Sequence, residues 1–317
     1  PWGIYALVGL SLAFFAYNRG LPLTIRSVFH PILGDRIYGF WGNVIDVLSV
    51  MATLFGLATS LGLGVTQVSA GLNYLFGLPT DTWFAVVLIG GITFFAVLSI
   101  ATGLDKGVKI LSMANMFMAV VLMVFLLLVG PTVYILKAFT QNIGFYLQNL
   151  PQLSFWVETY YGAEGSNWQN PWTIFYWGWW ISWSPFVGMF IARISKGRTV
   201  REFIMGVMVF PTLLSFLWMS SFGGSALWLQ ITGGADIASA VNKDVATALF
   251  VMLESFPLTK LTSFAGIILV TIFFVTSSDS GSLVVDHLTS GGKLDSPVPQ
   301  RIFWGVVEGS CAAALLM

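Results

Sequence analysis

Apolar residues run along this chain in long stretches and do not alternate with polar residues at a short period. An α-helix needs about 20 predominantly apolar residues to cross a bilayer. Such runs predict eight membrane-spanning helices, at residues 3–18, 44–72, 83–103, 108–136, 172–192, 203–229, 261–285 and 300–317. The pattern therefore predicts an all-α polytopic membrane protein.

The composition agrees with a membrane setting. Of the 317 residues, 56% are hydrophobic and only 9% are charged, whereas soluble domains carry about 25% charged residues. The formal net charge is zero, so the charge balance does not indicate a nucleic-acid partner. We therefore expect the lipid bilayer to surround the chain.

The basic residues predict the orientation of the helices, because cytoplasmic loops carry an excess of Lys and Arg. If the first helix runs from outside to inside, eleven of the fourteen Lys and Arg residues are cytoplasmic: Arg19, Arg26, Arg36, Lys106, Lys109, Arg193, Lys196, Arg198, Arg201, Lys293 and Arg301. The other three are Lys137, Lys243 and Lys260. The basic loop from Arg193 to Arg201 is therefore predicted to be cytoplasmic.

The most distinctive stretch covers residues 173–201, TIFYWGWWISWSPFVGMFIARISKGRTVR, an aromatic helix followed by the basic loop. Four Trp residues fall within seven positions, at Trp177, Trp179, Trp180 and Trp183. At about 100° per residue, one helix face carries Tyr176, Trp180 and Trp183, and an overlapping face carries Phe175, Trp179, Trp183 and Phe186. Several rings therefore point in the same direction.

Two interpretations of these aromatic faces are open from the residues alone. Trp residues gather at membrane interfaces, and rings that pack against lipid or other helices need no ligand. Alternatively, the rings form a cage for a quaternary ammonium ion, which has no N–H group to donate and gains about 2 kcal/mol or more per desolvated ring contact. The density of Trp residues favours the cage.

Two further spans carry polar side chains at membrane depth. Span 44–72, which includes Thr53, is rich in Gly, Ala, Ser and Thr; small residues allow close helix packing, and hydroxyl oxygens also suit a hard cation such as sodium. Span 261–285 contains FFVTSSDSGSLVV, with Asp279 among five hydroxyl side chains. Asp279 is either a functional acid within the membrane or lies near the cytoplasmic end and pairs with the basic loop.

The ends of the sequence predict that it is part of a longer chain. It opens on PWGIY without an initiator Met, and it stops at ALLM within an apolar run. The single cysteine, Cys311, cannot support a disulfide framework, so the sequence gives no indication of a redox compartment.

The sequence closely resembles the betaine/choline/carnitine transporter family along nearly its whole length. The most specific match is WGWWISWSPFVGMFIARISKGRTVREF, and PWGIY, SLGLG and FFVTSSDSG support it in the family's order. The loop NRGLPLTIRS is closer to the choline and glycine betaine branch than to the carnitine exchangers.

This resemblance implies a LeuT-type core of two five-helix inverted repeats, with the substrate near the bilayer midplane. Residues 1–317 would then form one partial transmembrane transporter domain that lacks the first three helices and the C-terminal end. Residues 1–136 would be the rest of the first repeat, and residues 172–317 part of the second. The resemblance further implies a bacterial-type inner (plasma) membrane and suggests a homotrimer.

The resemblance also implies a substrate site drawn from two distant stretches. The residues that match the family's aromatic box are Trp2, Tyr5, Trp179, Trp180 and Trp183. Those that match rings lining the path on either side of the box are Phe175 and Phe190.

For coupling, the resemblance implies sodium or a proton, and no cofactor or other metal. The residues that match one sodium site are Phe273, Thr276 and Ser277. Thr53 and Phe186 match the other, but Leu57 stands where sodium-coupled betaine carriers have a second Thr. The resemblance assigns Asp279 and Arg193 to gating or coupling on the cytoplasmic side.

The predicted function is import of a quaternary ammonium compound, choline or glycine betaine, by ion-coupled alternating access. An enzyme that uses Asp279 is disfavoured, because both histidines, His30 and His287, lie in or beside cytoplasmic connections. The alternatives are an onium-compound exchanger, an osmosensing receptor and a dimethylsulfoniopropionate carrier. These residues do not separate choline from glycine betaine.

Overall fold

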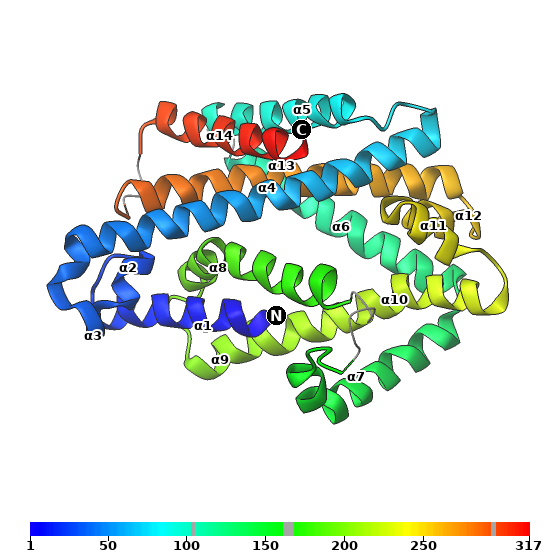
Figure 1. Ribbon diagram of the computed structural model, residues 1–317, viewed down its shortest axis with the longest axis horizontal. Helices are drawn as coiled ribbons and strands as arrows, with labels where there is room; N and C mark the ends of the chain where they lie inside the picture. The colour runs from blue at the N-terminus through cyan, green and yellow to red at the C-terminus, as the bar shows by residue number, and fades with distance from the viewer. Residues whose placement is uncertain (103–104, 161–167, 293–295) are drawn as a thin grey trace.

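The computed structural model describes residues 1–102, 105–160, 168–292 and 296–317, and within these ranges the regular structure is helical throughout (Figure 1). Lys293, one of the predicted cytoplasmic cations, and the last residue of the predicted span 83–103 lie outside the described residues. An all-helical fold is what the long apolar runs predict.

The α-helices follow one another along the chain as α1 (Trp2–Ala13), α2 (Ile25–Val28), α3 (His30–Leu33), α4 (Phe40–Phe76), α5 (Thr82–Thr102), α6 (Asp105–Val129), α7 (Thr132–Phe155), α8 (Phe175–Ile194), α9 (Val200–Ile204), α10 (Phe210–Thr232), α11 (Ile237–Lys243), α12 (Ala248–Glu254), α13 (Thr259–Thr289) and α14 (Val298–Leu316). Three π-helical segments extend α1 (Phe14–Asn18), precede α8 (Gln169–Ile174) and join α9 to α10 (Met205–Val209). Two 3₁₀ turns cover Gly34–Tyr38 and Val245–Thr247.

Five helical stretches in the described ranges are long and apolar enough to cross a membrane: Phe40–Phe76, Thr82–Ala101, Lys109–Val129, Val200–Thr232 and Thr259–Thr289. The predicted spans 3–18, 172–192 and 300–317 are also helical, as α1 with its extension, α8 and α14. These three helices are shorter or more polar; α14, for example, contains Arg301 and Glu308. Five of the predicted spans thus correspond to helices that could cross a membrane, and the number eight stays a prediction.

The predicted span 108–136 is wrong at its end. Helix α6 ends at Val129 and α7 begins at Thr132. Between them stands Pro131, which has no N–H group to donate and disfavours a helical conformation in the preceding residue. Helix α7 then continues to Phe155 and packs mainly against α10.

Helices α4 and α13 lie side by side through the centre of the molecule, with α5 and α14 on one side of the pair and α1 and α8 on the other (Figure 1). Three contacts between α4 and α13 recur at intervals of seven residues. They pair Leu57 with Gly281, Gly64 with Phe274 and Gly71 with Ile267. Each contact places a glycine against a large side chain, and a repeat of seven residues keeps the same faces of two helices together.

The loop after α1 is fastened to the beginning of α4 by one arginine. The Arg26 Nε donates to Asp46 Oδ2 at 2.5 Å, and the other guanidinium nitrogens donate to Ile37 O and Asn43 Oδ1. The Asp46 side chain is only 6% exposed. Because a buried carboxylate is costly without a partner, this ion pair fixes the position of the loop against α4.

We predict that Gly64→Ala destabilises the protein, because its Cβ would overlap the ring of Phe274, which is packed against the core of α4, α5 and α14. Overpacking costs about 1–3 kcal/mol. Gly90→Ala in α5 is the matched control, since a Cβ there meets nothing within 4 Å. Thermal unfolding in detergent should show a lower midpoint for Gly64→Ala alone, and equal midpoints would contradict the proposed close contact.

Candidate functional site

Helix α8 presents its aromatic residues to α1 and α4. The backbones of α1 and α8 approach closely because glycines face each other: a Cβ on Gly9 would lie 3.3 Å from the carbonyl oxygen of Gly188. Gly188 in turn packs against Val8. This approach brings the beginning of α1 beside the first half of α8.

The rings of Trp2, Tyr5 and Trp180 contact one another directly. Tyr5 and Trp180 stack with their ring centroids 4.8 Å apart and their planes 22° from parallel. Trp2 meets both rings edge-on, at 5.7 Å from Tyr5 and 5.4 Å from Trp180. Trp183, together with Trp2 and Trp180, packs against the hydrophobic cluster that contains Tyr5. The fold thus gathers four of the five residues predicted for the aromatic box.

The indole N–H groups of Trp179 and Trp183 both point toward Ser60 on α4. Trp179 Nε1 donates to Ser60 Oγ at 2.8 Å, and Trp183 Nε1 donates to Ser60 Oγ and to Gly56 O, each at 2.9 Å. Ser60 is 4% exposed and donates its own hydroxyl proton to Gly56 O. Two rings from α8 are therefore held in orientation by one buried hydroxyl, which sequence reasoning did not single out.

This arrangement can attract a cation through the ring faces. The stack of Tyr5 on Trp180 leaves no space for an ammonium group between these two rings. A trimethylammonium group would have to bind on the ring faces turned away from the stack, or enter after the two rings separate. Either mode uses the attraction between a cation and an aromatic face.

Further rings continue from this group toward the start of α8. Phe175 lies 5.8 Å from Trp179, and Tyr176 lies 5.6 Å from it, between ring centroids. Tyr176 stacks on Trp172, and Trp172 stacks on Trp168. Phe175 is therefore placed beside the predicted box, where the sequence expects a ring that lines the path.

Phe190 lies apart from these rings, toward the other end of α8. It lines a cavity of about 480 Å³ between α8 and α13, together with Phe186, Arg193, Ser280 and His287. Phe190 and Arg193 are exposed. The predicted gate residue Arg193 thus shares a cavity with the predicted path residue Phe190.

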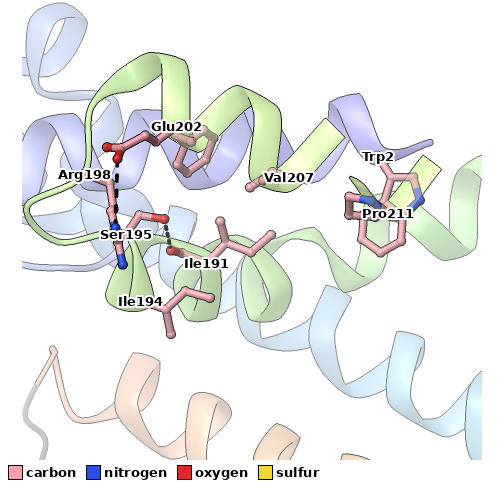
Figure 2. Close-up of a pocket in the computed structure, with 10 residues that line it drawn as sticks. Trp2, Ile191, Ile194, Ser195, Arg198, Glu202, Val207 and Pro211 are labelled. Atoms are coloured by element: carbon pink, nitrogen blue, oxygen red, sulfur yellow. Dashed lines mark hydrogen bonds and ion pairs between the residues drawn. The ribbon is translucent and has the colours of Figure 1, made fainter. Parts of the chain in front are cut away.

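Trp2 also borders a second cavity, of about 390 Å³, on the side of α8 that faces α9 and α10 (Figure 2). Figure 2 shows Trp2 and Pro211 at one end of this cavity and the pair of Arg198 and Glu202 at the other. Arg198 Nη1 lies 3.9 Å from Glu202 Oε1, and both side chains are more than half exposed. A surface ion pair of this kind contributes little stability.

The predicted ion-binding residues lie on three helices. Thr276 on α13 donates its hydroxyl to the carbonyls of Ile272 and Phe273 in its own helix, and Ser277 follows it. Thr53 on α4 is 1% exposed and donates to Ser49 O. Phe186 on α8 has its ring 5.3 Å from that of Trp183. Leu57, where a second Thr was expected, packs instead on Gly281.

Known proteins resemble this chain along its whole length. The model of the betaine/carnitine/choline family of transporters matches residues 1–317. The chain belongs to this family. It is 51% identical to a glycine betaine/proline/choline transporter of Vibrio parahaemolyticus over 317 residues. These residues are 100% of this chain and 56% of that relative. It is 49% identical over 315 residues to the glycine betaine transporter OpuD of Bacillus subtilis, covering 99% of this chain and 61% of the relative.

A third relative is glycine betaine transporter 1 of Vibrio parahaemolyticus, 47% identical over 316 residues, which are 100% of this chain and 60% of that protein. The chain therefore spans little more than half the length of these curated relatives. Proteins of this family are integral to membranes, which agrees with the five apolar helices. The resemblance read from the sequence motifs is confirmed.

Sequence reasoning about this family member missed one buried acid, Glu308 on α14. It is 1% exposed and accepts a hydrogen bond from Ser282 Oγ at 2.9 Å. Asp279, which is 6% exposed, is close enough for its charge to act on the Glu308 carboxyl group. The burial of Asp279 agrees with an acid inside the helix packing. Glu308 is the one acid in the last apolar run, and an acid in such a run is by itself a signal of function.

We predict that Ser60→Ala loosens the ring arrangement, because it removes the acceptor shared by Trp179 and Trp183. A buried donor left without its partner costs about 1–3 kcal/mol. Thr59→Val is the control, since the Thr59 hydroxyl donates to Phe55 O in its own helix. Tryptophan emission and the unfolding midpoint should shift in Ser60→Ala and stay near wild type in Thr59→Val; an unchanged emission in Ser60→Ala would show that Ser60 does not hold the rings.

Proposed function

We propose that the protein imports a quaternary ammonium compound, choline or glycine betaine, by ion-coupled alternating access. The observation that carries this proposal is the meeting of Trp2 and Tyr5 on α1 with Trp180 and Trp183 on α8. A permanently charged trimethylammonium group offers no hydrogen-bond donor, so exposed ring faces are the protein groups best suited to it. The names of the relatives, which are those of transporters of glycine betaine or choline, support the same substrate class.

The architecture proposed for this function is a LeuT-type core, in which residues 1–136 and 172–317 belong to two inverted repeats within eight membrane helices. Substrate would bind near the midplane, where the repeats meet. Phe175 and Phe190, at opposite ends of α8, would line the route on either side of the ring group. Arg193 and Asp279 would act in the cytoplasmic gate. Assembly as a homotrimer is a further proposal that rests on the family resemblance.

Alternating access requires only binding and movement, so no covalent step is assigned to any residue. Relatives at this identity are named as transporters and not as enzymes. An exchanger, an osmosensing receptor and a carrier of dimethylsulfoniopropionate are the competing functions, and each gives a different result in a transport assay.

We predict that Trp180→Leu lowers the apparent affinity for choline or glycine betaine by about 10- to 100-fold, since one cation–ring contact contributes about 2 kcal/mol. Trp177→Leu is the matched control, because Trp177 lies on the same helix, is 52% exposed and makes none of the ring contacts described above. Uptake of each labelled compound is measured with the full-length protein in vesicles.

The vesicle experiment also tests the mechanism. Uptake driven by an imposed gradient supports a symporter. Uptake that occurs only when the vesicles are loaded with an onium compound identifies an exchanger. Binding without uptake identifies a receptor. Equal affinity of both Trp variants would exclude the ring group as the substrate site.

We predict that uptake depends on the coupling ion with a Hill coefficient near one. Leu57 supplies no side-chain oxygen to the second predicted ion site, which leaves one site. The Hill coefficient cannot exceed the number of coupled sites. Sodium and proton gradients are imposed separately. Ser277→Ala should weaken the response to the driving ion, and Thr271→Val on the same helix, whose hydroxyl donates to Ile267 O, should not. A Hill coefficient near two would contradict the loss of the second site.

A further inference from the structure

Glu308 lies in the middle of α14, a helix that packs on α5, α4 and α13 (Figure 1). This position is on the side of the α4–α13 pair opposite α1 and α8, so Glu308 is separate from the ring group. The residue is 1% exposed and is among the largest fully buried side chains of the described residues. The transport mechanism proposed above does not use it.

The carboxyl group of Glu308 faces hydroxyl groups on α13. Ser282 Oγ donates to Glu308 Oε2 at 2.9 Å. Ser278, one helical turn earlier, is 2% exposed and lies against the same carboxyl group. Its Oγ has no hydrogen-bond partner. A buried polar group is normally paired, so the Ser278 hydroxyl is placed to share a hydrogen bond with this carboxyl group, as donor or as acceptor.

No basic side chain in the described part of the chain forms an ion pair with Glu308. Helix α5 carries no ionisable residue between Thr82 and Thr102. The ionisable residues on α4 are Asp46, which pairs with Arg26, and Tyr74, which donates to Glu254 on α12. The ionisable residues of α13 are Lys260, Asp279, Asp286 and His287, of which Asp279 is the electrostatic neighbour of Glu308. Arg301 on α14 lies 3.8 Å from Asp286 Oδ2.

An ionised carboxylate without a cation is very costly in a dry interior, and it must be neutralised by a proton or by a metal ion. Helix α14 packs closely on α5 and α13 on either side of Glu308. A Cβ on Gly309 would overlap the side chain of Thr93, and one on Gly305 would lie 3.1 Å from Val97 and 3.5 Å from Ser282 Oγ. Sites for hard cations need several oxygen ligands around an open position, whereas a proton needs only one acceptor.

We propose that Glu308 is a proton-binding site between α13 and α14. In the arrangement described here the carboxyl group is protonated, accepts a hydrogen bond from Ser282 and can donate one to Ser278. When α13 moves relative to α14, water reaches the carboxyl group and the proton leaves. The proposal rests on the transport function proposed above, because α13 also carries the predicted ion-binding residues Thr276 and Ser277.

Infrared difference spectroscopy on the purified full-length protein tests this site. A neutral carboxylic acid has a C=O stretching band that an ionised carboxylate lacks. We expect this band to change when choline or glycine betaine is added and when the pH is raised, and to be absent from Glu308→Gln. Glu254→Gln, which alters an exposed carboxylate on α12, is the control and should keep the band.

Substrate affinity gives a second measurement. If substrate binding changes the protonation of one group, the Kd changes by up to about tenfold per pH unit over the titration range. We expect this slope in the wild type and a flat profile in Glu308→Gln. Should Glu308→Gln fail to fold, Ser278→Ala and Ser282→Ala replace it, and each is expected to shift the pH midpoint of the infrared band.

The outcomes separate this proposal from the transport function. A neutral-carboxyl band that responds to neither pH nor substrate makes Glu308 a permanently protonated packing residue and overturns the proposal. If uptake by Glu308→Gln no longer depends on sodium while the infrared band is unchanged, Glu308 is a cation site. That result also overturns the proposal. If the wild type binds neither choline nor glycine betaine, the transport proposal fails, whereas the pH titration of the band still tests Glu308.

Discussion

The close contact of α4 with α13 sets the positions of the helices that pack around this central pair. On α4 the contact residues are Leu57, Gly64 and Gly71, and on α13 they are Gly281, Phe274 and Ile267. In a bilayer, helices gain little from hydrophobic burial against one another, so packing through small residues has to hold them together. Because each large side chain fills the space beside a glycine, the two helices are held in one register. This register determines where the other helices can pack on the pair.

The hydrogen bonds of the buried polar groups are also set by the bilayer, because its core holds no water to pair with them. A buried hydroxyl or charge in the helix interior needs a partner within the protein. Thr53 finds one in its own helix, and two others come from neighbouring helices. Ser60 on α4 accepts from Trp179 and Trp183 on α8, and Ser282 on α13 donates to Glu308 on α14. The first contact orients the aromatic rings, and the second holds a carboxyl group on the opposite side of the central pair. Movement of α13 would therefore alter both the predicted ion-binding stretch and the surroundings of Glu308.

Much of the fold could be predicted from the sequence, because the length of an apolar run depends only on neighbouring residues. The long helices α4, α5 and α13 follow the predicted spans closely. The break between α6 and α7 was missed, although Pro131 marks it, because the apolar run continues past the proline. The candidate ring residues were identified through their match to a family motif, and Glu308 was missed because no motif contains it.

Membership of the betaine/carnitine/choline family, the membrane setting and the aromatic stretch at residues 175–186 can all be read from the sequence alone. These properties are local, since hydrophobicity and motif matches are read from adjacent positions. The stacking of Tyr5 on Trp180 and the hydrogen bonds of two indole rings to Ser60 become visible only in the folded chain. Such contacts depend on which helix faces meet, and the meeting faces are set by steric fit between distant glycines and large side chains.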